Sequence, residues 1–154
     1  MKRLFMVCVL CLCLGACQSA RPDIDAETAA ARITATCESD RFVRADADFI
    51  STNFGSPDYL KEATVYYAAN GDGTEFGFFL VANAAKVPDM ERLVKDYLAT
   101  ERAAVESLAA LYPAEELSDR LARFDRATVG HAGDTVYYCM AEPALCQRFL
   151  KEIK

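Results

Sequence analysis

The sequence predicts an α+β domain: a four-stranded, mainly antiparallel sheet of two hairpins, packed by a long central helix, a C-terminal helix and an N-terminal helix. Turns at 70–73 and 132–133 each contain glycine and join two runs rich in β-branched and aromatic residues, which predicts the hairpins. Apolar residues recur at helical spacing before, between and after the hairpins. With 138 of 154 residues following a short leader, the chain is long enough to bury one sizeable core.

The chain opens with a short apolar leader. Lys2 and Arg3 are followed by eleven apolar residues, 4–14. As a helix these eleven residues rise only about 16 Å, against a hydrocarbon core of roughly 30 Å. The segment is therefore typical of a signal peptide and not of a membrane span.

The leader ends in Leu14-Gly15-Ala16-Cys17, which is typical of the lipobox of bacterial lipoproteins. This pattern predicts cleavage between Ala16 and Cys17 and a lipid on the Cys17 sulfur; the alternative is an ordinary secretory leader with a chance cysteine. Two acyl chains anchor stably, because each buried methylene contributes about 0.8 kcal/mol. We expect a lipid-anchored protein on the extracytoplasmic face of a cell membrane. Its expected parts are the signal peptide (1–16), the lipidated cysteine and tether (17–25) and a single α+β domain (26–154).

The charge of the mature chain restricts its partners. Loss of Lys2 and Arg3 leaves 15 basic against 23 acidic side chains, a net charge of −8. Such a surface repels nucleic acid and anionic lipid headgroups. We therefore expect no nucleic-acid partner, and membrane contact only through the lipid on Cys17.

Two helices are expected before the first hairpin. The first covers 26–37, with Asp25 as its N-cap and a stripe of small and apolar residues at helical spacing: Ala26, Ala29, Ala30, Ile33 and Cys37. The second covers 46–54 and ends at Gly55.

The first hairpin joins strands 62–69 and 75–82 through Asn70-Gly71-Asp72-Gly73, whose glycines tolerate positive φ. Residues 76–81 are apolar on both faces, which is typical of a central strand covered on two sides.

A long helix is expected over 88–112, beginning at Pro88 and stopped by Pro113, with a short helix over 114–121. The second hairpin pairs 126–131 with 134–140, so that Val136 and Tyr138 face one way and Tyr137 and Cys139 the other. The last helix follows Glu142-Pro143.

Several segments of the C-terminal two-thirds occur in a familiar order: V-P-D-M-E-R-L-V-K-D-Y-L, then Y-P-A-E-E-L, then T-V-Y-Y and a closing helix. Together with the lipobox, residues 63–154 resemble the domain-of-unknown-function 4358 family of small bacterial lipoproteins. The resemblance implies no activity and no site residues. It points to low-GC Gram-positive lineages, and hence to the outer leaflet of the cytoplasmic membrane.

Three cysteines remain after Cys8, Cys11 and Cys13 leave with the leader and Cys17 takes the lipid: Cys37, Cys139 and Cys146. Thiols outside the cytoplasm tend to oxidise. One turn between Cys139 and Cys146 can bring their Cα atoms within the roughly 4.4–6.8 Å that a disulfide needs. Loop entropy instead favours a Cys37 pairing, at about 4.7 against about 2.5 kcal/mol. A Cys139–Cys146 disulfide, a Cys37 pairing and three buried thiols all stay open.

Two tyrosine pairs are the candidate ligand surface: Tyr66, Tyr67, Tyr137 and Tyr138. They lie on strands expected to be neighbours, and alternation places one member of each pair on each face of the sheet. Such rings offer contact area and hydrogen bonds to a peptide or sugar. The alternative is cross-strand packing, in which each hydroxyl finds a partner.

The sequence contains no catalytic or metal-binding signature. His131 is the only histidine and ends the expected strand 126–131 beside a hairpin turn, where exposure is expected. Asn70 to Glu75 superficially echoes a calcium loop, but Thr74 and Val81 stand where that loop needs ligands. We expect no cofactor, no metal and no catalytic residue.

The sequence thus favours a non-catalytic binding or interaction domain, with an envelope protein or peptide as partner. The alternative is an envelope enzyme, a hydrolase that uses carboxylates. A deep cavity with converging titratable groups would favour the enzyme, and a shallow aromatic surface would favour the binding domain.

Overall fold

One antiparallel sheet with the strand order β1-β2-β3-β5-β4 organises the domain. The structure is a computed structural model that describes residues 24–36, 41–111 and 113–153. The strands are β1 (Phe42–Arg44), β2 (Leu60–Ala68), β3 (Glu75–Val81), β4 (Thr128–Ala132) and β5 (Thr135–Met140). The helices are α1 (Ala26–Ala35), α2 (Ala47–Phe54), the short 3-10 helix η1 (Ala84–Lys86), α3 (Val87–Ser107), α4 (Ala114–Asp125) and α5 (Pro143–Glu152).

The α+β class and both hairpins are confirmed, but the predicted number of strands is wrong. The sheet has a fifth strand, β1, which pairs with β2 along its outer edge. Three residues are too few to show the alternation by which a strand is recognised in a sequence. Helix α2 begins one residue later than expected, at Ala47. Asp46 is its N-cap, and the Asp46 side chain accepts a hydrogen bond from the Phe49 amide at 2.8 Å.

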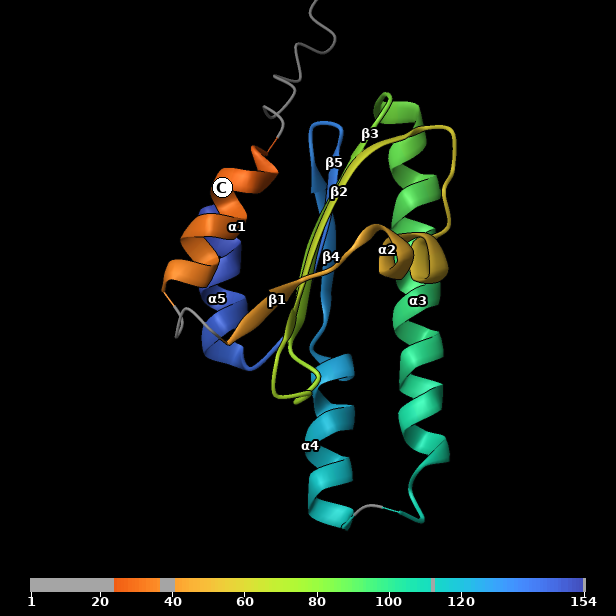
Figure 1. Cartoon of the computed structure of the whole chain (residues 1–154), viewed down its shortest axis with the longest axis vertical. Coiled ribbons are helices and arrows are strands. Elements are labelled where there is room, and N and C mark those ends of the chain that lie inside the picture. Colours follow the sequence, from red (N-terminus) through yellow and green to blue (C-terminus); the bar gives the residue numbers. More distant parts are fainter. Residues whose placement is uncertain (1–23, 37–40, 112, 154) are drawn as a thin grey trace, which may run out of the picture.

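The apolar strand β3 lies at the centre of the sheet, as predicted from its sequence. Helices cover both of its faces: α1 and α5 pack on one side, and α2 and α3 on the other (Figure 1). Alternation sends Phe76 and Phe78 to the α1/α5 face and Phe79 and Val81 to the α3 face, and all four are buried.

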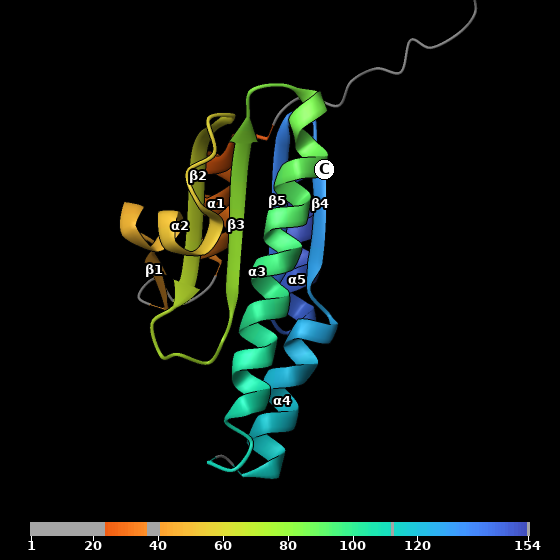
Figure 2. The same cartoon turned by 90° about the vertical axis from the view of Figure 1, so that its right-hand side faces the viewer.

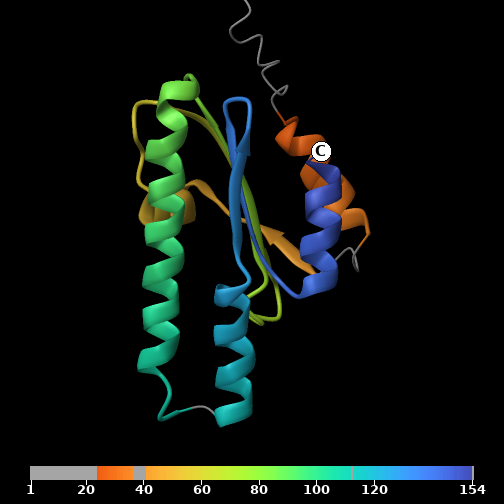
Figure 3. The ribbon, with the colours of Figure 1, turned by 180° about the vertical axis from the view of Figure 1, so that it is seen from behind.

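The long helix α3 continues past the end of the sheet. Since η1 leads directly into it, the helical residues are continuous from 84 to 107. Its first half packs on the sheet through Met90, Val94 and Leu98. Beyond the β2–β3 turn its only neighbour in view is α4, which runs antiparallel to it (Figures 2 and 3). The two helices form an arm whose tip carries Leu111, 77% exposed.

None of the helices within the described ranges combines the length and the apolar character needed to cross a bilayer. The predicted signal peptide, the Ala16–Cys17 cleavage site, the lipidated Cys17 and most of the tether fall in residues 1–23, outside the described part of the chain.

Candidate functional site

A buried carboxyl group, Glu75, stands at the point where the sheet ends and the α3–α4 arm begins. Glu75 is the first residue of β3 and is 7% exposed. Its side chain accepts hydrogen bonds from two tyrosine hydroxyls. Tyr97 of α3 donates to both carboxyl oxygens at 3.0 Å, and Tyr138 of β5 donates to Oε1. The carboxyl is thereby held between the sheet and the helix that covers it.

Strand register brings the three groups together. Glu75, Gly77 and Phe79 alternate onto the α3 face, and Gly77 pairs directly with Tyr138. A Cβ atom on Gly77 would lie 2.6 Å from Cε1 of Tyr138. The absence of a side chain at Gly77 therefore lets the Tyr138 ring lie across β3 and reach Glu75, two residues along the strand.

Burial dominates the electrostatics of this cluster. Desolvation raises the pKa of Glu75 to about 7, the two tyrosine hydrogen bonds oppose that rise, and the nearby charge of Glu101 adds to it. Burial and the Glu75 carboxyl raise the pKa of Tyr97 and of Tyr138 above the usual tyrosine range. Both tyrosines therefore stay protonated and donate, while Glu75 changes its charge near neutral pH.

A half-enclosed cavity of about 220 Å³ opens onto this carboxyl. Its wall combines acidic, aromatic and aliphatic side chains from the turn 71–73, β3, β5 and both helices of the arm. The lining residues beyond the turn are Glu75, Tyr97, Glu101, Val105, Arg120, Phe124 and Met140. Such a mixture of apolar wall and a few convergent polar groups is typical of small-molecule sites.

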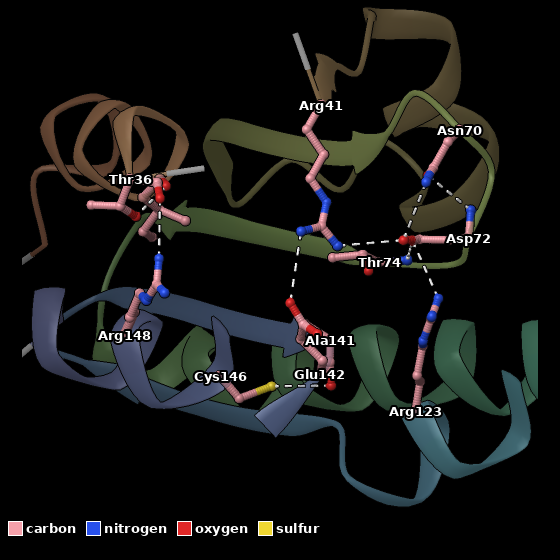
Figure 4. Close-up of polar contacts among 11 residues, drawn as sticks. Thr36, Arg41, Asn70, Asp72, Thr74, Arg123, Ala141, Glu142, Cys146 and Arg148 are labelled. Atoms are coloured by element: carbon pink, nitrogen blue, oxygen red, sulfur yellow. Dashed lines mark hydrogen bonds and ion pairs between the residues drawn. The ribbon is translucent and has the colours of Figure 1, made fainter. Parts of the chain in front are cut away.

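The turn that forms one wall of the cavity is held by ion pairs (Figure 4). Asp72 accepts a hydrogen bond from the Thr74 amide at 2.8 Å, which closes the turn. Its carboxylate also lies 3.2 Å from Nη1 of Arg123 on α4 and 3.4 Å from Nη2 of Arg41, and Arg41 reaches Glu142 at 3.7 Å. These contacts, together with the hydrogen bonds from Thr74, keep the pKa of Asp72 below its usual value despite burial.

A second hollow of about 500 Å³ lies between α2 and the outer edge of β2. It is more open than the Glu75 cavity, and its walls include Arg44, Asp46, Lys61 and Glu62, each at least partly exposed to solvent. It holds no buried titratable group, so we regard the Glu75 cavity as the candidate site.

The two predicted disulfide partners lie together on the opposite face of the sheet. Sγ of Cys139 is 3.5 Å from Sγ of Cys146, and both residues are buried. Sγ of Cys146 also lies 3.5 Å from the carbonyl oxygen of Ala141 (Figure 4). The hydrogen bond between the two thiols holds the pKa of Cys146 below its usual value. Cys37, the competing partner, falls outside the described residues.

The four candidate tyrosines do not form one surface. β3 separates β2 from β5, so the expectation that their strands are neighbours is wrong. Tyr66 and Tyr137 pack in the α1/α5 core, Tyr67 stacks on Phe49 of α2 at 5.5 Å, and Tyr138 is fully buried. Of the four, only Tyr138 belongs to the Glu75 cluster.

The remaining candidates behave as surface groups. His131 is half exposed, and its Nδ1 lies 2.8 Å from Oε1 of Glu91 on α3. Among the described residues, no three side chains of His, Cys, Asp or Glu come together as a metal site.

Sequence reasoning missed Glu75, although a signal was present. Alternation along the apolar run 76–81 places Glu75 on the same face as Phe79, which is an inward face. A charged residue in phase with a buried stripe is the pattern that predicts a buried carboxyl.

Comparison of the chain with protein-family models, with curated proteins and with solved structures found no match. The family resemblance of residues 63–154 therefore stays a prediction.

Proposed function

We propose that this protein is a membrane-anchored extracytoplasmic lipoprotein whose domain is a non-catalytic binding module, with the cavity over Glu75 as its binding site. The observation that carries the proposal is a carboxyl buried at the wall of a cavity. Burying an ionisable group costs free energy, and here Glu75 is kept at an inward-facing position at the wall of a cavity of about 220 Å³.

The lipobox supports the anchored location. The start of α1 and the tip of the α3–α4 arm lie at opposite ends of the molecule (Figure 1). An anchor attached ahead of α1 therefore leaves the arm, and the cavity at its base, open to the surroundings.

The anchor is tested with Cys17→Ser. Labelled palmitate is expected in the wild-type protein and not in this variant, and the variant is expected to leave the membrane fraction. Retention of Cys17→Ser in the membrane would contradict a lipid anchor at this residue.

The binding site is tested by filling the cavity. Val105 lines it from α3 and is partly exposed, so Val105→Trp adds volume there without removing a charge. Native mass spectrometry of protein gently extracted from membranes is expected to show a small molecule bound to the wild type and lost from Val105→Trp. Leu111→Trp, at the exposed tip of the same arm, is the matched control. Equal ligand retention by both variants would contradict the assignment of the site.

An envelope enzyme is the second candidate, and it is favoured by a cavity that two carboxyl groups line and by the raised pKa of one of them. Glu75 has a pKa of about 7 beside a second carboxyl, Glu101, and a group that titrates near the working pH suits general acid–base catalysis. Against it, both Glu75 oxygens already accept tyrosine hydroxyls. Turnover of a glycoside or ester by the wild type, abolished by Glu75→Gln, would favour the enzyme.

A further inference from the structure

The charges around the cavity over Glu75 are unevenly compensated. Asp72 is matched by Arg41 and Arg123, and Arg120 pairs with Glu116 at 3.4 Å. Glu101, in contrast, forms no ion pair with any of the residues that the structure describes, although it faces the same space as Glu75. Three acidic side chains, Asp72, Glu75 and Glu101, therefore line the cavity against one basic side chain, Arg120, with Glu75 on β3 and Glu101 on α3.

One side of the wall is apolar and the space is small; of the other polar lining groups, Asp72 and Arg120 are held in the ion pairs above, and Tyr97 donates to Glu75. Val105, Phe124 and Met140 give it an aliphatic and aromatic side. A volume of about 220 Å³ equals roughly seven waters at about 30 Å³ each. It therefore fits a molecule of roughly five to ten non-hydrogen atoms with one polar end.

We infer that the cavity takes a small organic cation, with a primary ammonium group between Glu75 and Glu101 and a short apolar body against Val105, Phe124 and Met140. The inference rests on the proposed binding function and names its ligand class. An ammonium group has three donors and no acceptor, which matches a site in which two carboxyl groups supply acceptors. The carboxylate of an amino acid or fatty acid would meet like charge here, which disfavours anionic ligands.

Met140 allows a direct test, because its side chain lines the cavity. The chain has four methionines, of which Met1 and Met6 belong to the leader. Met90 is fully buried under α3 and lies outside the cavity, so it is an internal control. Full-length protein labelled with ¹³C at the methionine methyl groups is titrated with n-butylammonium, n-butanol and butyrate, which share one apolar body. The Met140 signal is assigned with Met140→Leu.

Butylammonium is expected to shift the Met140 methyl signal while Met90 stays in place, and to bind more tightly than butanol or butyrate. Glu75→Gln and Glu101→Gln are each expected to weaken the binding of butylammonium about tenfold, which is the typical effect of losing one charge-assisted hydrogen bond. Both variants are expected to bind butanol as tightly as the wild type does. Glu101→Gln changes a partly exposed side chain and keeps the buried cluster intact. Glu106→Gln, on the same helix but paired with Arg102 outside the cavity, is expected to bind like the wild type.

Two failures are distinguishable. If butanol or butyrate shifts Met140 at concentrations equal to or below those needed for butylammonium, the cation assignment is overturned while the cavity stands as a binding site. If no probe moves Met140, the cavity does not take small ligands, and both the cation assignment and the proposed function at this site are overturned.

Discussion

The two faces of the sheet are covered in different ways, and the cavity over Glu75 lies on the face that α3 covers. On one face α1 and α5 lie together and pack on Phe76, Phe78 and Cys139. On the other face α2 packs beside the long helix α3, which crosses the sheet and then leaves it, so that the last turns of α3 lie against α4 instead of strands (Figure 2). The cavity and the buried Glu75 lie at that transition. The difference shows how a close-packed core and a binding space arise in one small domain, according to whether the covering helices match the extent of the sheet.

The largest loss of stability is expected from a substitution in the core between the sheet and helices α1 and α5. Phe149 of α5 is fully buried and stacks on Phe78 with ring centroids 5.3 Å apart. Phe149→Ala is expected to lower the free energy of unfolding by about 4 kcal/mol, because it removes buried contacts and leaves a void. Urea denaturation measures the change, with the exposed Leu111→Ala as a control that shifts stability by less than about 0.5 kcal/mol. Equal effects of the two variants would contradict a close-packed α5.

The α3 face of the sheet is expected to make stability depend on pH, through Glu75. The pKa of Glu75 is about 7 in the folded state, against an ordinary 4.5, so folding favours the protonated carboxyl. Its stabilising contribution is fully present below pH 4.5 and is lost as pH rises through 7. The shift is worth about 3 kcal/mol.

Glu75→Gln removes this titration while keeping an acceptor for the tyrosines. Between pH 5 and 8.5, the wild type is therefore expected to lose about 2–3 kcal/mol more unfolding free energy than Glu75→Gln. The groups that face Glu75 are Tyr97, Tyr138 and Glu101, and all three are present in both proteins. Parallel pH profiles would contradict the raised pKa.

A disulfide between Cys139 and Cys146 would link helix α5 covalently to strand β5 and stabilise the α1/α5 face further. We predict that Cys139 and Cys146 are joined in protein isolated from the envelope, because their sulfurs lie 3.5 Å apart and thiols outside the cytoplasm tend to oxidise. The short loop stabilises by about 2.5 kcal/mol, so Cys146→Ser is expected to lose that amount.

The competing pairing has its own signature. Cys37→Ser is expected to leave stability and the disulfide unchanged, as read by mass spectrometry of alkylated, non-reduced protein. A loss of stability in Cys37→Ser as large as in Cys146→Ser would show that Cys37 is a partner.

The smallest loss of stability is expected from replacing a glycine, and one glycine on each face of the sheet can be compared. Gly77→Ala would bring a Cβ within 2.6 Å of the Tyr138 ring and 2.8 Å of Val65, both fully buried. The expected cost is about 2 kcal/mol, with a further rise in the Glu75 pKa as the Tyr138 hydrogen bond is lost. Gly130→Ala meets only the end of the Tyr137 side chain, which is partly exposed and can move. It is expected to cost less and to leave the Glu75 titration unchanged; the reverse order would contradict the role assigned to Gly77.

Local signals determined much of this protein from its sequence. The lipobox, the α+β class, both hairpins, the central position of 76–81 and the alternation of Val136 and Tyr138 against Tyr137 and Cys139 all follow from patterns within a few residues. Of these, the elements of the folded domain are confirmed, and the lipid anchor stays a prediction. Hydrophobic periodicity and turn chemistry act over short distances, so one sequence is enough to read them.

Only the tertiary structure decided which elements meet. Glu75, Tyr97 and Tyr138 are far apart in the chain. No local sequence pattern predicts that β5 pairs with β3, that α3 packs over Glu75 or that α3 extends beyond the end of the sheet. The edge strand β1 was missed for the same reason, since it is defined by its partner β2 more than by its own three residues. A site assembled from strand order and helix placement depends on long-range packing, which periodicity along one segment does not encode.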